Sequence, residues 1–203
     1  MKKLRFIILS ILSFCIYFSV FANSELDSLE QKPTNTIIPF VSLMVEQIHG
    51  ENRTIVQKGF SAGITINNRV NLGVFSAWST DDFSFEKTGL LRQFKMKYIH
   101  GGVLTSYNLR ISKSSTLNLG TRVGQGSVRL LNTNSETGIV KQSVYIMHPD
   151  VGFEISPFSQ VKLKFNVGYR LMSDLKLQEL VKGDLAGFSY GMSVKIDLFK
   201  KNF

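Results

Sequence analysis

The most constraining feature of this sequence is an unbroken two-residue alternation across Gln160–Leu171. Every second position is apolar or aromatic, at Val161, Leu163, Phe165, Val167, Tyr169 and Leu171. The intervening positions carry Lys162, Lys164, Asn166, Gly168 and Arg170. This period predicts a β-strand with one apolar and one polar face. A soluble sandwich can expose such a polar face, but a chain built almost wholly of these strands behind a secretion signal favours a membrane barrel with a polar lumen.

Residues 1–22 have the pattern of a signal peptide. A basic start precedes the apolar run Phe6–Phe21, and we expect cleavage near Ala22. An uncleaved membrane anchor is one alternative, although the run is short for a spanning helix. A lipoprotein anchored through Cys15 is another, although the bulky Phe14 precedes that cysteine where a small residue is usual.

The remainder suits one exported domain, with a flexible segment over residues 23–36 and a barrel over residues 37–203. Because Cys15 is the only cysteine, the processed chain has no disulfide. The formal net charge is +9, but the cations are spread singly through the expected strands. This spacing argues against a nucleic-acid partner, and we expect outer-membrane lipid instead. No stretch after residue 22 is long enough for a spanning helix, whereas barrel strands need only about 9–11 residues.

The rest of the chain reads as about eight strands joined by alternately short and long connections. A short turn at Asn67-Asn68 is favoured because asparagine tolerates the left-handed backbone that a hairpin needs. Short turns at one rim and long loops at the other are typical of bacterial outer-membrane barrels. The sequence therefore predicts a single all-β domain, an antiparallel up-and-down transmembrane barrel with these strands: Ile37–Ile48, Thr54–Ile66, Arg69–Thr80, Leu91–Ile111, Thr116–Leu131, Gly138–Ile155, Gln160–Leu171 and Gly187–Phe199.

Three of the expected strands change the phase of their apolar positions partway along. The changes fall near Gly101-Gly102, Gly124–Gly126 and His148-Pro149. An inserted residue, or β-bulge, at the glycines would produce such a change.

The inward faces carry charged residues that we expect to form an ion-pair network. An eight-strand barrel is only wide enough for side chains to fill it, and an unpaired buried charge is costly. Counting outward from the turn at Ser156–Ser159 places Glu154 near Lys162 and Asp150 near Asn166. The network would plug the lumen, although an ion-conducting or ligand-binding lumen stays open as an alternative. The expected members are Arg110, Arg122, Asp150, Glu154, Lys162, Lys164, Arg170, Lys195 and Asp197.

No residue pattern indicates catalysis, a metal site or a cofactor. His49, His100 and His148 have no partners at metal-ligand spacing, and we interpret them as surface or bulge residues. No nucleophile-elbow motif or Ser, His and acid set is evident. We expect aromatic residues near strand ends to form interfacial girdles, at Trp78, Tyr98, Tyr107, Phe153, Tyr169, Tyr190 and Phe199.

The C-terminal third carries a family likeness in Pro149–Glu154, Val167–Arg170, Asp184–Gly191 and the closing strand Met192–Ile196. Together these stretches resemble the small porin-like outer-membrane β-barrel proteins common in Bacteroidota, most of which are uncharacterised. The resemblance implies a barrel in the bacterial outer membrane and implies no substrate. A further resemblance is to the signal that the barrel-assembly machinery reads, which would make that machinery a partner and involves Gly191, Val194, Ile196 and Phe203.

The leading expectation is a non-enzymatic outer-membrane barrel with a narrow, plugged lumen, whose outer loops contact an envelope protein. A small pore, or an accessory of a transport or secretion complex, is the first alternative. An exported soluble barrel that binds a small ligand, as lipocalins do, is the second. That version needs apolar residues inside and polar residues outside, the reverse of the faces assigned above.

Overall fold

The computed structural model describes residues 36–51, 54–79, 85–87, 90–92, 94–112, 114–132, 140–173, 185–199 and 201–202. The expected signal peptide and nearly all of the segment 23–36 lie outside the described residues, as do Phe203 and the greater part of the last loop. Among the described residues, no helix has the length and apolarity needed to cross a membrane.

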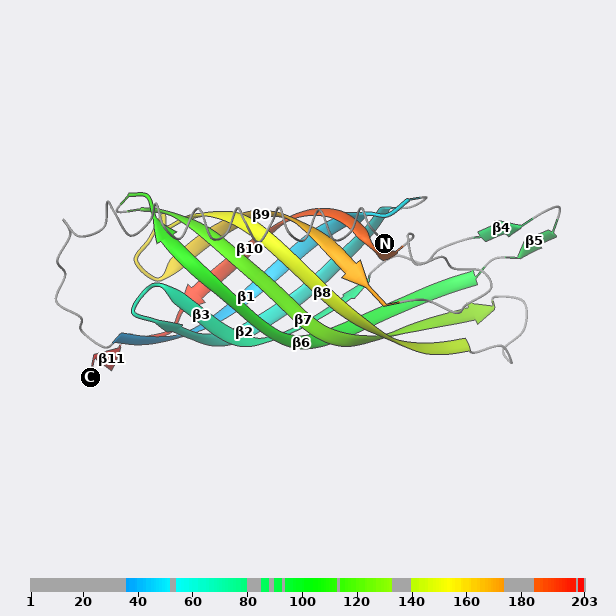
Figure 1. The fold of residues 1–203 in the computed structure, drawn as a ribbon, viewed down its shortest axis with the longest axis horizontal. Helices are drawn as coiled ribbons and strands as arrows, with labels where there is room; N and C mark the ends of the chain where they lie inside the picture. Colours follow the sequence, from blue (N-terminus) through cyan, green and yellow to red (C-terminus); the bar gives the residue numbers. More distant parts are fainter. Residues whose placement is uncertain are drawn as a thin grey trace, which may run out of the picture. The chain divides into compact units, whose positions relative to one another are not determined.

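Eight long strands form a closed antiparallel up-and-down barrel, as the alternation predicted (Figure 1). Each strand pairs with its neighbours in the chain, and β10 pairs with β1 from Phe40↔Asp197 to His49↔Phe188 to close the barrel. The small strands β4 (Phe85–Lys87) and β5 (Leu90–Arg92) pair with each other, and β11 (Lys201–Asn202) pairs with the start of β1. The barrel strands are β1 (Thr36–His49), β2 (Thr54–Ile66), β3 (Val70–Ser79), β6 (Phe94–Arg110), β7 (Ser115–Asn132), β8 (Val140–Ile155), β9 (Val161–Met172) and β10 (Gly187–Asp197).

The two ends of the barrel differ in their connections. We call the end with residues 67–69, 111–114 and 156–160 the short-turn end, and the opposite end the loop end. Asn67 and Asn68 have φ values of 52° and 56°, so the expected left-handed turn is confirmed. The first residue of β1 and the last residue of β10 lie at the short-turn end. At the loop end, β6, β7 and β8 extend farthest (Figure 1).

Side chains alternate between the lumen and the exterior along every barrel strand. The exterior is apolar over most of each strand, with Leu43 70% exposed and Val103 61% exposed. The expected girdle residues are exposed except for Tyr98, whose assignment was wrong because its ring is 1% exposed inside the lumen. Of the expected assembly signal, Val194 and Ile196 point outward and Gly191 lies on the inward face.

The expected bulges were wrong. The β6–β7 register runs without insertion from Phe94↔Asn132 to Arg110↔Thr116, and the β7–β8 register is continuous through His148 and Pro149. The phase of burial is also constant, because Tyr98 points inward on β6 while Val103 and Tyr107 point outward. The apparent phase change therefore has another cause: the inward face is polar near the short-turn end and apolar near the loop end.

Candidate functional site

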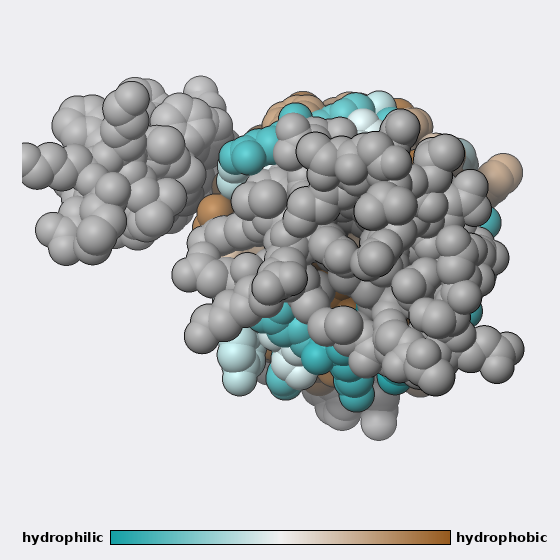
Figure 2. Space-filling model, turned by 90° about the vertical axis from the view of Figure 1, so that its right-hand side faces the viewer, coloured by the Kyte–Doolittle hydropathy of each residue, from teal (hydrophilic) through white to brown (hydrophobic). Residues whose placement is uncertain are grey.

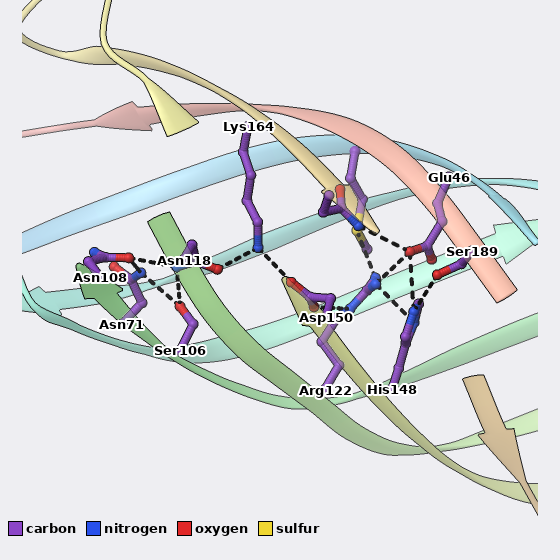
Figure 3. A network of polar contacts seen from close by, with 12 residues as sticks. Glu46, Asn71, Ser106, Asn108, Asn118, Arg122, His148, Asp150, Lys164 and Ser189 are labelled. Atoms are coloured by element: carbon purple, nitrogen blue, oxygen red, sulfur yellow. Dashed lines mark hydrogen bonds and ion pairs between the residues drawn. The ribbon is translucent and has the colours of Figure 1, made fainter. Parts of the chain in front are cut away.

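The lumen holds a polar network whose centre is Arg122 on β7. Its Nη2 atom lies 2.7 Å from Glu46 Oε1 on β1 and 2.9 Å from His148 Nδ1 on β8 (Figure 3). Its Nε atom lies 3.7 Å from Asp150 Oδ2, also on β8. All four side chains are buried. Since buried charges need partners, Arg122 ties opposite walls of the barrel together.

Lys164 on β9 links this cluster to a group of amides. Its Nζ atom donates to Asp150 Oδ1 at 2.8 Å and to Asn118 Oδ1 at 2.6 Å (Figure 3). Asn118 Nδ2 donates in turn to Asn108 Oδ1 at 2.6 Å, and Asn71 Nδ2 donates to the same oxygen at 3.1 Å. The buried amides thus extend the network across β3, β6 and β7.

The network continues to the mouth at the short-turn end. Lys195 Nζ donates to Thr65 Oγ1 and to Asn71 Oδ1, both at 2.9 Å. Lys162 Nζ lies 3.1 Å from Asp197 Oδ2 and 3.6 Å from Glu154 Oε1. These pairs lie beside a recess of about 480 Å³ that opens at this mouth.

Arg170 is the least balanced cation of the lumen. Its side chain is 0% exposed, its Nη2 donates to Gln57 Oε1 at 2.6 Å, and Glu46 Oε2 lies 3.5 Å away. The guanidinium also stands over the Tyr98 ring at 5.7 Å from its centroid. Its Nε and Nη1 atoms have no hydrogen-bond partner among the described residues. Arg170 therefore depends on Glu46 for its charge balance.

The structure places every expected network residue except Arg110 in the buried or half-buried lumen. Arg110 is exposed at the mouth, where its Nε donates to the Ser112 carbonyl. The expected neighbour of Asp150 was wrong, because the register pairs Asp150 with Gly168 rather than Asn166. The centre of the turn lies one residue later in the chain than the count assumed, so each partner moves by two positions, and Asp150 contacts Lys164 instead.

Several network residues were missed by sequence reasoning. Glu46 was not predicted, because the adjacent inward positions of β1 are the apolar residues Met44 and Ile48, so the strand shows no alternation of polar and apolar residues there. His148 was interpreted as a surface or bulge residue, but it is 2% exposed inside the lumen. His100 is buried as well and stacks on Tyr98 with ring centroids 4.9 Å apart. The signal available for Glu46 was an isolated acid within a predicted strand.

His148 and Ser189 form a buried contact that resembles part of a hydrolase site. His148 Nε2 lies 2.7 Å from Ser189 Oγ and 3.6 Å from Glu46 Oε1 (Figure 3). However, Arg122 can only donate, so His148 Nδ1 accepts and the proton of the neutral ring sits on Nε2. Nε2 then donates to Ser189 and cannot take its proton. The arrangement is structural rather than that of a base and its nucleophile.

An apolar cluster occupies the lumen toward the loop end. Tyr98 and Met96 of β6 pack with Val128 of β7 and with Leu185, which lies two residues before the start of β10. The remaining members are Ile55, Val144, Ile146 and Met172. Two groups of side chains therefore occupy the lumen, the polar network toward the short-turn end and the apolar cluster toward the loop end.

Free space inside the barrel lies in the recess of about 480 Å³ at the short-turn mouth and in a smaller cavity. A cavity of about 90 Å³ lies among Ser42, Phe75, Asn118, Asn166 and Lys195. Such a volume holds a few water molecules at most. Within the described part of the chain, no group of His, Cys, Asp or Glu side chains could hold a metal ion.

Comparison with known proteins shows a fold and no family. No family model and no curated protein sequence matches the chain. Neisserial surface protein A is similar in structure, with a TM-score of 0.57 and 13% identity over 80% of this chain and 97% of that one.

Two further solved structures agree. The N-terminal β-barrel domain of Pseudomonas aeruginosa OprF has a TM-score of 0.55 and 11% identity over 81% of this chain and 98% of that one. The attachment invasion locus protein Ail of Yersinia pestis, in complex with the heparin analogue sucrose octasulfate, has a TM-score of 0.50 and 10% identity over 83% and 99%. The fold is thus that of small outer-membrane barrels, while the likeness to Bacteroidota proteins stays a prediction.

Proposed function

We propose that this chain forms a closed barrel in the bacterial outer membrane that conducts no ions. Its role is structural: the barrel presents its loop end at the cell surface. The observation that carries the proposal is the combination of an apolar exterior with a lumen occupied by a polar network and an apolar cluster. Both features follow from the same alternation, read on opposite faces of the strands.

The exterior supports a membrane location. On β9 the outward positions from Val161 to Leu171 are all apolar or aromatic, and β10 shows the same from Phe188 to Ile196. These stretches match the roughly 9–11 residues that a tilted barrel strand needs to cross a bilayer. A lipocalin-like soluble barrel needs the opposite arrangement, so the soluble alternative is disfavoured.

The lumen supports a seal rather than a pore. An ion entering from the short-turn end would meet Lys162 and Asp197, then Lys164 and Asp150, then the Arg122–Glu46 pair. It would finally meet the apolar cluster that includes Tyr98 and Val128. Breaking buried ion pairs costs several kcal/mol each, on the order of 3–5 kcal/mol. A passing ion therefore faces successive barriers.

Planar-bilayer recording tests the seal. Purified, folded protein should insert without producing conductance steps, because ion pairs and an apolar cluster occupy the lumen. Insertion is measured separately by flotation with lipid vesicles and by the difference in gel mobility between boiled and unboiled samples. Stable, reproducible conductance steps from inserted wild-type protein would overturn the seal and favour the pore alternative.

The remaining roles stay predictions. An envelope-protein partner at the loop end can be sought by cross-linking in intact cells. Recognition by the barrel-assembly machinery through Gly191, Val194, Ile196 and Phe203 can be tested by replacing each residue and measuring outer-membrane yield. A yield unchanged in all four variants would contradict the assembly signal.

A further inference from the structure

Three cations stand side by side on the outward surface at the loop end. The register pairs Lys97 on β6 with Arg129 on β7, and Arg129 with Lys141 on β8. All three side chains are exposed. Directly opposed residues of an antiparallel pair have Cβ atoms roughly 4.5–5.5 Å apart. Lys97, Arg129 and Lys141 therefore form one continuous row, which we call the cation row.

The protein does not neutralise this row from its own described residues. The ion pairs among described residues all join lumen side chains, and none involves the cation row. The described outward positions of the barrel strands carry no Asp or Glu. Like charges placed directly opposite each other destabilise a sheet. An anion from outside the protein would remove that cost.

The cation row lies on the loop-end side of the apolar belt. On β6, Ile99 is the next outward residue after Lys97 toward the short-turn end. On β8, Ser143 separates Lys141 from Tyr145, which is 67% exposed. On β7, Ser127 and Gln125 separate Arg129 from the belt. The neighbouring strands stop near this level, since β3 ends at Ser79 and β9 at Met172. Figure 2 looks onto this end of the barrel, where hydrophilic residues gather along the lower part of the visible rim. The row is thus placed where lipid headgroups meet an embedded barrel.

We propose that the cation row binds the phosphate groups of a phosphorylated glycolipid, of the lipid A type, in the outer leaflet. The proposal rests on the membrane location proposed above. Arg129, at the centre, presents a planar fork that suits a phosphate, while the two lysines add point charges on either side. A lipid is favoured over a soluble anion because the row lies on the same outward face as the apolar belt. Acyl chains lying along Ile99 and Tyr145 would bring the phosphates to the row.

Lipid binding by the full chain in uncharged detergent micelles tests the proposal. The probes are fluorescent diphosphoryl lipid A and the same lipid without its phosphates. Each cation near an anionic lipid surface contributes about fivefold in binding. The variant Arg129→Gln/Lys141→Gln should therefore bind diphosphoryl lipid A on the order of 30-fold more weakly. The charge-matched control Arg69→Gln/Arg110→Gln, at the exposed short-turn end, should bind like wild type.

Three results would overturn the assignment. The first is equal affinity of the wild type for the phosphorylated and dephosphorylated lipids. The second is an unchanged affinity in the Arg129→Gln/Lys141→Gln variant. The third is tighter binding of soluble heparin than of diphosphoryl lipid A with the same dependence on the row. If that variant does not fold, the affinity of the wild type for diphosphoryl lipid A is measured at increasing salt concentration instead. A site of several cations must lose affinity steeply as salt rises, and an affinity independent of salt would overturn the assignment. Flotation with vesicles keeps a failure of the membrane assignment distinct from a failure of the lipid site.

Discussion

Replacing Glu46 with Gln is the sharpest test of the lumen network. The change keeps the shape of the side chain and creates no cavity, so its effect reports charge. It removes the carboxylate that lies 2.7 Å from Arg122 and 3.5 Å from Arg170. Arg122 keeps Asp150 at 3.7 Å, whereas Arg170 retains no carboxylate contact among the described residues. Arg170 then becomes a fully buried cation without a counter-charge.

The expected cost follows from this geometry. Removing one partner of a buried ion pair costs about 3–5 kcal/mol, and the surviving contact between Arg122 and Asp150 places the value near the lower limit, at about 3 kcal/mol. Removing Arg170 as well, in Glu46→Gln/Arg170→Met, leaves no stranded cation. That double variant should therefore be more stable than Glu46→Gln alone, with a coupling free energy of at least about 1 kcal/mol.

Denaturant unfolding in uncharged lipid vesicles provides the measurement. Trp78 is the only tryptophan and faces outward, so its fluorescence reports loss of the folded, lipid-facing barrel. Gel mobility without boiling confirms that each variant starts folded. If Glu46→Gln changes the free energy of unfolding by less than about 0.5 kcal/mol, the network does not hold the barrel together. If the double variant loses as much as the sum of the single variants, Arg170 does not depend on Glu46.

Three further substitutions test other parts of the reasoning. Val167→Arg, at the centre of the outward belt of β9, should cost about 2–4 kcal/mol of folding free energy in vesicles, whereas Ser143→Arg near the loop end should cost about 0–1 kcal/mol; equal costs would misplace the belt. Gly102→Ala would drive its Cβ into the facing backbone across β7, so we expect a loss of about 1–3 kcal/mol by denaturant unfolding, and a negligible loss would mean that the strands can separate there. Asn68→Val should cost about 1–2 kcal/mol because of its positive φ, while Asn68→Gly should not; similar unfolding midpoints would argue against a strained turn.

Much of this architecture could be predicted from local pattern. Two-residue alternation identified the eight strands, the polar face of β9 and the turn at Asn67-Asn68. Partner identity was harder, because it depends on register around the whole barrel. Placing the centre of the turn after Glu154 one residue too early was enough to assign Asp150 the wrong neighbour. The acid on β1 that anchors the network was hidden because its strand mixes polar and apolar residues on the inward face.

The apparent phase changes in β6, β7 and β8 have one physical explanation. Toward the loop end the outward positions become polar, as at Lys97, Ser127 and Ser143, while the inward positions become apolar, as at Tyr98 and Val144. A strand surrounded by lipid is apolar outside, and a strand surrounded by water is apolar inside. If the barrel spans the membrane as proposed, the level at which the outward face becomes polar and the inward face apolar is the level at which these strands leave the hydrocarbon core of the bilayer. No bulge is needed, since the solvent changes while the register does not. The cation row lies beyond this level on the outward face of β6, β7 and β8. The apolar cluster lies on the inward side of these strands and includes residues of β2 and β9 as well.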